Sequence, residues 1–251
     1  MTGVEKPLDI VIKTRVFDAV PFAQLQKDLA AHNRLHGRVY VIVPSNERGQ
    51  FAGLIGKDDV VLTAEEVALA AGARLVREPR RGYGRAFRAG LRSISPDCEI
   101  VVFLDGDGSD YPEMMDRLVE PIIEGTHDFV VSSRTRGRRE RGSMNWHQVF
   151  AGYMIGFFLR LLYGVHSTDM GPFRAIRRDA LESLGMREET YGWPLEMQMR
   201  AARAGLRILE VPVDYRPRAG GQSKIAGTVR GSVLAATRIL LTLARIAMEP
   251  R

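Results

Sequence analysis

At 251 residues, 45% of them hydrophobic, the chain is long enough to bury a substantial core, which excludes an intrinsically disordered protein. Its single cysteine, Cys98, excludes an intramolecular disulfide and suits the cytosol, and the N-terminal residues lack the apolar segment of a signal peptide. The 36 basic and 30 acidic residues give a net charge of +6, which favours anionic partners such as phosphates, nucleic acid or acidic lipid headgroups.

The first half of the chain alternates between strand and helix patterns. Apolar, β-branched runs predict strands at 9–12, 38–43, 74–76, 100–104 and 129–132. Helical periodicity predicts helices at 21–32, 64–71, 84–93 and 112–124. This alternation is typical of a doubly wound α/β sheet, in which ligands bind at the carboxyl ends of the strands.

The second half follows a different pattern. We expect an apolar stretch at 149–165, a loop at 166–181, a helix near 195–204, a strand within 206–215 and a terminal helix at 224–248. The apolar stretch is shorter than the roughly 20 residues that span a bilayer, and Arg160 interrupts it. It is therefore expected to be buried or to lie at an interface.

The terminal helix carries a basic stripe. Arg230, Arg238 and Arg245 recur at spacings of eight and seven residues, which places them on one helical face. Such a stripe fits a helix that lies in a membrane interface. It equally fits a helix packed on its own domain, or on a second copy of the chain, with the arginines outward.

An acidic loop follows the most apolar of the predicted strands. The run EIVVFL has no alternation, which is typical of a strand buried on both faces, and Asp105, Asp107 and Asp110 come directly after it. Asp105 and Asp107 can point to one side, while Gly106 and Gly108 allow the backbone to turn. A divalent cation carrying phosphates would compensate the repulsion between these carboxylates. A polar turn that starts a helix explains the loop equally well.

Five segments, in a fixed order, resemble the family 2 glycosyltransferases, in particular the polyprenyl-phosphate (dolichyl-phosphate mannose synthase-like) branch. They are REPRRGYGRAFRAGL, VVFLDGDGSDYPE, SSRTRG, TDMGPFRAIRRDAL and YGWPLEMQMRAARAGLRILEVPVDYRPRAGGQSKIAGTVRGS. The resemblance runs from about Val61 to the C-terminus. It implies a glycosyltransferase A fold, an α/β fold with a doubly wound, mostly parallel sheet and acceptor-side helices towards the C-terminus.

The same resemblance implies a single glycosyltransferase domain over 1–251. Its nucleotide-sugar-binding half would be 1–135, its acceptor-side half 136–223, and a C-terminal amphipathic helix would follow at 224–251. The implied activity is that of an inverting, metal-dependent glycosyltransferase that uses a UDP- or GDP-sugar.

Two motifs would hold the diphosphate of the donor. Asp105, Gly106 and Asp107 match the family's Asp-x-Asp motif, which binds Mg²⁺ or Mn²⁺, and this match accounts for the acidic loop. A mobile Arg-x-Gly-Gly-x-Ser-Lys segment lies over the diphosphate in the family. Its matches in this chain are Arg218, Ser223 and Lys224. The two cationic residues would stabilise the charge that develops on the leaving group.

The N-terminal third departs from the family pattern and leaves two registers open. In one register, 39–44 is the first strand and Glu47 reaches the nucleoside. In the other, 8–15 is the first strand and 44–59 is a remodelled base-binding loop, which preserves the normal strand count and is slightly preferred. In either register Asp58 or Asp59 is the candidate that contacts the base or ribose.

Another candidate for the donor lies ahead of a predicted helix. Arg81 and Gly82 precede the helix at 84–93, whose N-terminus could approach phosphate or ribose closely. A tight start to a helix, without any ligand, explains the glycine as well.

Acidic residues match the family's acceptor side. If the acceptor is a hydroxyl, Asp169 or Glu196 should act as general base. If the acceptor is a phosphate, it is already ionised, and arginines such as Arg134 would hold it instead. Trp193 could pack on sugar or lipid, or belong to the core.

The expected acceptor is a membrane-embedded lipid phosphate such as polyprenyl phosphate, reached from the cytoplasm by peripheral membrane contact. The apolar stretch, the basic stripe and the arginine-rich segment 133–142 motivate this expectation, since each basic residue near an anionic surface contributes about 1 kcal/mol. The rival is a homodimer that buries the same surfaces and glycosylates a soluble hydroxyl compound. A degenerate homologue that binds a sugar nucleotide without turnover also stays open. No nucleic-acid partner is expected, because the arginine-rich segment has no interleaved aromatic residues.

Overall fold

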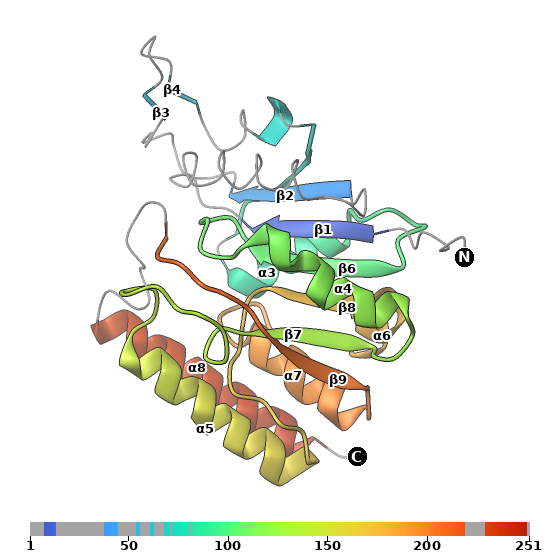
Figure 1. The fold of residues 1–251 in the computed structure, drawn as a ribbon. Helices are drawn as coiled ribbons and strands as arrows, with labels where there is room; N and C mark the ends of the chain where they lie inside the picture. Colours follow the sequence, from blue (N-terminus) through green and yellow to red (C-terminus); the bar gives the residue numbers. More distant parts are fainter. Residues whose placement is uncertain are drawn as a thin grey trace.

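The computed structural model describes residues 8–13, 38–44, 54–55, 61–62, 68–70, 72–80, 82–218 and 229–249. At its centre lies a seven-stranded sheet (Figure 1). From one edge to the other its strands are β5 (Arg74–Glu78), β2 (Arg38–Pro44), β1 (Leu8–Lys13), β6 (Ile100–Asp105), β8 (Arg174–Arg177), β7 (Phe129–Ser133) and β9 (Ile208–Pro212). Only β8 runs antiparallel to its neighbours within this sheet. A separate antiparallel pair consists of β3 (Leu54–Ile55) and β4 (Val61–Leu62).

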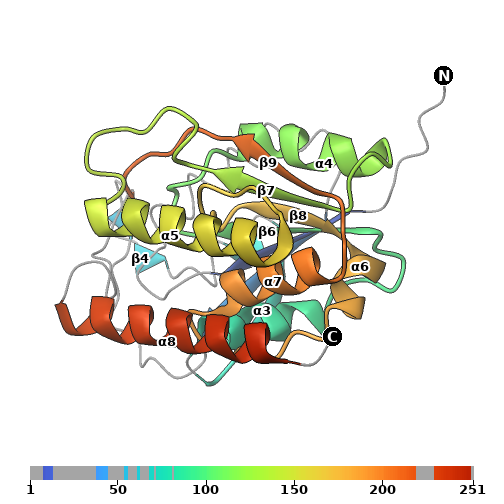
Figure 2. The same ribbon diagram turned by 90° about the horizontal axis from the view of Figure 1, so that it is seen from below.

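Helices cover both faces of the sheet (Figures 1 and 2). In chain order they are α3 (Tyr83–Leu91), η1 (Pro112–Met114), α4 (Met115–Ile123), α6 (Arg178–Ser183) and α7 (Trp193–Arg203). Alternate residues of β6 point to opposite faces of the sheet. Val102 and Leu104 pack in the core beneath α4, whereas Val101 and Phe103 pack in the core that includes α3, α6 and α7. The run is apolar without alternation because both of its faces are buried, as predicted.

The strands predicted for the first half are all present, each within two residues of its expected bounds. The predicted helices at 84–93 and 112–124 are also present, and 68–70 of the helix expected at 64–71 is helical. The helix expected at 21–32 lies outside the described residues. Since β1 pairs in parallel with both β2 and β6, the prediction that 8–15 is the first strand is confirmed over the described residues 8–13. Most of the base-binding loop expected at 44–59 lies outside the described residues.

The prediction of a loop over 166–181 was wrong, because this segment contains β8 and α6. Its strand is short, and three of its four residues are buried, including Arg174, which has no exposed surface. A charged residue is rarely buried so completely, so the arginine in this short segment argued against a buried strand.

Two long helices form a further layer against α7. The helices α5 (Trp146–Tyr163) and α8 (Val229–Met248) both contribute to a core that includes Ile155, Leu195 and Ile246 (Figures 1 and 2). The apolar stretch of α5 is thus partly buried and partly exposed. No helix in the described part of the chain is long and apolar enough to cross a membrane.

The described part of the expected basic stripe on the terminal helix is exposed: Arg238 and Arg245 both lie at the surface. Arg245, whose side chain is 43% exposed, also pairs with Glu196 at 3.2 Å and with Glu188 at 3.5 Å, so it ties α8 to α7 and to the segment before it. These ion pairs were not foreseen, because the carboxylates come from distant parts of the sequence. The side chain of Arg230 lies outside the described residues.

Candidate active site

Four segments of the chain meet at one end of the sheet because of the directions in which its strands run. The parallel strands β6, β7 and β9 end there, and β8 begins there because it runs the opposite way. The acidic loop after β6 pairs with the segment after β9 through a bridge between Asp110 and Tyr215. Arg134, directly after β7, meets Asp169, ahead of β8. The expected site at the carboxyl ends of the strands therefore contains residues from both halves of the chain.

The acidic loop is buried. Asp107 is 3% exposed and accepts hydrogen bonds from the backbone and side chain of Ser109. Asp110 is 1% exposed, and neither of its carboxylate oxygens has a hydrogen-bond partner among the described residues. Burial, together with the nearby charges of Asp105 and Asp107, raises the pKa of Asp110 well above its usual value. Such an excess of buried negative charge favours the binding of a cation.

The loop fits a cation that arrives with phosphates. Among the described residues, no group of three or more histidine, cysteine, aspartate or glutamate side chains could hold a metal ion alone. One or two carboxylates are what a protein usually gives to Mg²⁺ when substrate phosphates complete its coordination. Asp105 and Asp107 meet that requirement, and the unsatisfied Asp110 beside them adds to the attraction.

The segment after β9 crosses the acidic loop. Arg218 pairs with Asp107 at 3.0 Å, so the structure brings together these two predicted site residues. The backbone N–H of Arg216 donates to the carbonyl of Ser109 at 3.2 Å, and its Nε donates to the carbonyl of Gly108 at 2.6 Å. Arg218 is thus held over the predicted diphosphate site. Five other candidates lie outside the described residues: Asp58, Asp59, Arg81, Ser223 and Lys224.

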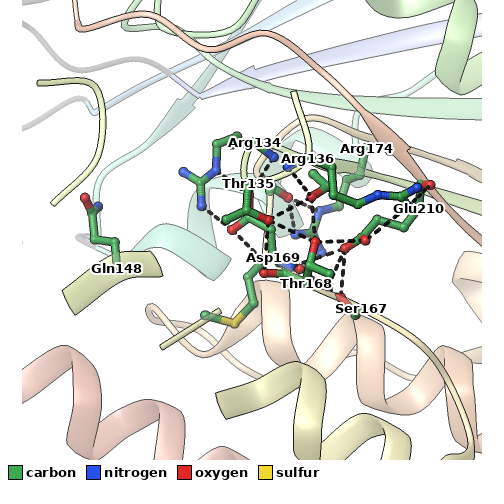
Figure 3. Close-up of polar contacts among 12 residues, drawn as sticks. Arg134, Thr135, Arg136, Gln148, Ser167, Thr168, Asp169, Arg174 and Glu210 are labelled. Carbon is green, nitrogen blue, oxygen red and sulfur yellow. Dashed lines mark hydrogen bonds and ion pairs between the residues drawn. The ribbon is translucent and has the colours of Figure 1, made fainter. Parts of the chain in front are cut away.

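Arg134 and Asp169 form a buried ion pair (Figure 3). The Nε of Arg134 donates to Oδ2 of Asp169 at 2.7 Å and its second guanidinium nitrogen to Oδ1 at 2.8 Å, while the backbone N–H of Arg134 donates to Oδ2 at 2.9 Å. Burial alone would raise the pKa of Asp169, but the charge and hydrogen bonds of Arg134 hold it below its usual value. The guanidinium also lies 5.0 Å from the ring centroid of Tyr215.

Glu196 lies in a different environment from Asp169. It has no exposed surface, it pairs with Arg200 at 3.0 Å and with Arg245 at 3.2 Å, and it accepts the backbone N–H of Arg187 at 3.0 Å. These contacts join α7 to α8 and to the preceding segment. Glu196 thus has a structural role between helices, and its expected place beside the acceptor stays a prediction.

The glycine before α3 also has a structural explanation. A Cβ at Gly82 would collide with the carbonyl of Glu189, and one at Gly84 with the carbonyl of Glu188. The backbone N–H groups of Gly84 and Arg85 already donate to Thr190 and Glu189, at 3.3 and 3.0 Å. The start of α3 thus packs against the chain's own backbone, as the alternative of a tight helix start without a ligand expects, and the approach of a ligand to Gly82 stays a prediction.

Trp193 belongs to the core. It is 1% exposed and stacks on Phe87 with ring centroids 4.9 Å apart, and it meets Phe103 edge to face at 5.0 Å. It therefore does not line an open site for sugar or lipid.

Sequence reasoning missed a carboxylate that lies beneath the Arg134–Asp169 pair. Glu210 of β9 accepts the backbone N–H groups of Thr168 and Asp169 (Figure 3). The available signal was an acidic residue inside the apolar run ILEVP, where a solvent-facing side chain is the usual explanation. Its partners lie about 40 residues away in the sequence, which local patterns do not reveal.

Comparisons with known proteins agree with this geometry. The model of the family described as "Glycosyl transferase family 2" matches residues 57–185. An uncharacterized glycosyltransferase of Mycobacterium tuberculosis is 35% identical over 199 residues, which cover 78% of this chain and 86% of the relative. An undecaprenyl-phosphate mannosyltransferase of Micrococcus luteus is 34% identical over 168 residues, which cover 64% of this chain and 67% of the relative.

Solved structures share the fold. Glucosyl-3-phosphoglycerate synthase from Mycobacterium tuberculosis, in complex with Mn²⁺, UDP and glucosyl-3-phosphoglycerate, superposes with a TM-score of 0.69. The alignment covers 97% of this chain and 81% of that one at 20% identity, so it carries the fold alone. With the sequence matches and the sheet topology, it follows that this chain belongs to glycosyl transferase family 2 and is a glycosyltransferase of the glycosyltransferase A fold.

Proposed function

We propose that this glycosyltransferase transfers a sugar, with inversion, from a nucleotide sugar to the phosphate of a polyprenyl lipid. The observation that carries the proposal is the environment of Asp169, the carboxylate expected to act as a base for a hydroxyl acceptor. Arg134 occupies both of its oxygens and lowers its pKa, which makes it a poor base. A phosphate acceptor needs no base, because it is already ionised at neutral pH.

The donor would bind over the acidic loop. Asp105 and Asp107 would hold Mg²⁺ or Mn²⁺ on the diphosphate of a UDP- or GDP-sugar, where the cation stabilises the charge of the leaving group. Arg218, already beside Asp107, would contact the same diphosphate. The phosphate oxygen of the acceptor would then attack the anomeric carbon as the bond to the nucleoside diphosphate breaks. The two expected halves, 1–135 and 136–223, would both contribute to each substrate, because Arg218 of the second half lies beside Asp107 and Arg134 of the first half pairs with Asp169.

Arg134 is the proposed contact for the acceptor phosphate. Its guanidinium is fixed by Asp169 and by the ring of Tyr215, so its charge is directed before a ligand arrives. Two relatives support a lipid acceptor by their names: the undecaprenyl-phosphate mannosyltransferase of Micrococcus luteus, and a dolichyl-phosphate hexose transferase of Haloferax volcanii that is 33% identical over 174 residues.

The helix α5 supplies a surface that suits a lipid bilayer. Large apolar side chains recur every three or four residues along its exposed side: Trp146, Phe150, Tyr153, Phe157 and Leu161. On α8, Leu240 and Leu241 are also exposed. Three exposed arginines precede α5 at 138, 139 and 141. Apolar residues beside basic ones are typical of proteins that lie at an anionic membrane surface. We therefore propose peripheral contact with the cytoplasmic face of the membrane.

Turnover assays would test the acceptor. UDP- and GDP-sugars are offered with Mn²⁺, Mg²⁺ or a chelator, together with polyprenyl phosphate in detergent or with soluble hydroxyl acceptors. We expect metal-dependent transfer to polyprenyl phosphate for one donor base. Transfer to soluble hydroxyl compounds alone would refute the lipid acceptor. Donor binding without transfer to any acceptor would support a degenerate homologue instead.

A further inference from the structure

The segment Ser167–Asp169 is held by a single carboxylate from β9. Oε1 of Glu210 accepts the backbone N–H of Thr168 at 2.7 Å and that of Asp169 at 3.2 Å, as well as the hydroxyl of Ser167 at 3.2 Å (Figure 3). Oε2 accepts the hydroxyl of Thr168 at 3.0 Å. Two consecutive backbone N–H groups that converge on one oxygen form a small anion site, here occupied by the protein's own side chain.

This carboxylate is well compensated although it is buried. Its side chain is 7% exposed, and the ion pair with Arg136 is long, at 3.6 Å. Most of the compensation comes from the four hydrogen bonds of the Ser167–Asp169 segment. Hydrogen bonds to a buried carboxylate are strong, so Glu210 also fixes the positions of the backbone and hydroxyl groups that donate to it.

The other side of the same segment is fixed by α5 and α7. A Cβ at Gly156 would collide with the carbonyl of Ser167, and one at Gly152 would lie 2.9 Å from the carbonyl of Thr168. Gln198 of α7 donates through Nε2 to the carbonyl of Asp169 at 3.1 Å. Glu210 thus holds the N–H side of the segment while α5 and α7 close its carbonyl side.

The position of Asp169 determines where the guanidinium of Arg134 points. Both oxygens of Asp169 bind Arg134, whose guanidinium lies 5.0 Å from the ring centroid of Tyr215, and Tyr215 bridges to Asp110 of the acidic loop. We propose that Glu210 is a positioning residue for the Arg134–Asp169 pair: it sets the place at which the acceptor anion meets the donor. This inference rests on the proposed function, because it assigns Arg134 to the acceptor.

The test uses three variants of the full chain. E210A removes the carboxylate, and E210Q keeps one oxygen that can accept the two backbone N–H groups. D128A is the matched control, because Asp128 is similarly buried and also accepts a backbone N–H, that of Arg207, and pairs with Arg207 and Arg177 away from the site.

We expect E210A to lower kcat/KM for polyprenyl phosphate by roughly 10- to 100-fold, because a small misplacement of a binding group has effects of that size. The KM for the nucleotide sugar should change by less than about twofold, since Glu210 does not touch the donor loop. E210Q should recover most of the loss, and D128A should lower thermal stability with acceptor kinetics like those of the wild type. An equal effect of D128A on acceptor kinetics would overturn the inference.

A double-mutant cycle and hydrogen exchange separate this inference from the proposed function. If Glu210 acts through Asp169, E210A should have little further effect in a D169N background, whereas additive effects would refute the idea. E210A should also accelerate exchange of the Thr168 and Asp169 amide protons in the ligand-free protein, and D128A should not. If the wild-type protein has no turnover on polyprenyl phosphate, the proposed acceptor is wrong, and exchange alone decides the inference: unchanged exchange overturns it and accelerated exchange supports it.

Discussion

Two clusters of buried carboxylates lie at the same end of the sheet, where β6, β7 and β9 finish. They differ in how their negative charge is compensated. In the acidic loop, Asp110 has two buried oxygens without a hydrogen-bond partner among the described residues, and its pKa is raised. In the second cluster, Asp169 lies ahead of β8 and Glu210 lies on β9. Arg134 donates to Asp169 and lowers its pKa, and the backbone N–H of Thr168 donates to Glu210. In the first cluster Arg218 pairs with Asp107 but Asp110 lacks a hydrogen-bond partner among the described residues. In the second cluster both carboxylates have partners within the folded chain and orient other groups.

The strongest test of the first cluster is Asp107→Ala. We expect turnover to fall by at least about 10²- to 10³-fold, and binding of the nucleotide sugar with Mn²⁺ to weaken greatly, because a proposed ligand of the cation is removed. Calorimetric titration with and without Mn²⁺ measures the binding. If the metal-dependent affinity of D107A equals that of the wild type, Asp107 does not hold the cation.

The second cluster is tested by Asp169→Asn. This change leaves the buried guanidinium of Arg134 without its carboxylate, and breaking such a pair typically costs about 3–5 kcal/mol of unfolding free energy. The folded pKa of Asp169 is lowered, so its stabilising contribution is present above the unfolded pKa of about 3.9 and is lost as the pH falls through the folded pKa. The difference in unfolding free energy between wild type and D169N should therefore be full at neutral pH and shrink below about pH 4. A difference that does not change with pH would contradict this assignment.

The opposite sign is expected for Asp110→Asn. The folded pKa of Asp110 is raised, so its favourable contribution is present below the unfolded pKa of about 3.9 and is lost as the pH rises through the folded pKa. D110N should therefore stabilise the metal-free protein at neutral pH, which thermal unfolding would show as a higher Tm. Thermal unfolding with Mn²⁺ and nucleotide should show a smaller advantage, because the cation compensates the wild-type loop. If D110N is instead less stable than the wild type, the negative charge of Asp110 is already compensated in the metal-free protein.

The smallest effect concerns the membrane and the exposed side of α5, the helix that packs against the second cluster through Gly152 and Gly156. We expect the wild-type protein to sediment with anionic vesicles at low salt and less at high salt, and the double variant F150Q/F157Q to bind several-fold more weakly because apolar area is removed. The control is L69Q, since Leu69 is similarly exposed but precedes β5 at the far edge of the sheet. No vesicle binding at low salt, together with a stable dimer in solution, would favour the homodimer.

The acidic loop illustrates which parts of a site are predictable from sequence. Asp105 and Asp107 follow a buried strand and a glycine separates them, so their position at the strand end follows from local periodicity and turn chemistry. The meeting of Arg218 with Asp107 was expected only from the resemblance to a family, because more than a hundred residues separate the two. The packing of Gly82 and the ion pairs of Glu196 and Arg245 were not foreseen for the same reason, since each depends on a partner remote in the sequence.

The strands of the first half, the apolar character of α5 and the acidic turn after β6 could be predicted, because these features depend on neighbouring residues. The direction of β8 could not, because it depends on long-range pairing: β8 runs antiparallel to β6 and β7 and so brings Asp169 to their carboxyl ends. The tertiary structure also decided which buried charges are compensated: Asp169 finds Arg134 across 35 residues and Glu210 finds the Asp169 backbone across 41. The physical reason is that burial makes an unpaired charge costly, while its partner can come from any strand that finishes at the same end of the sheet.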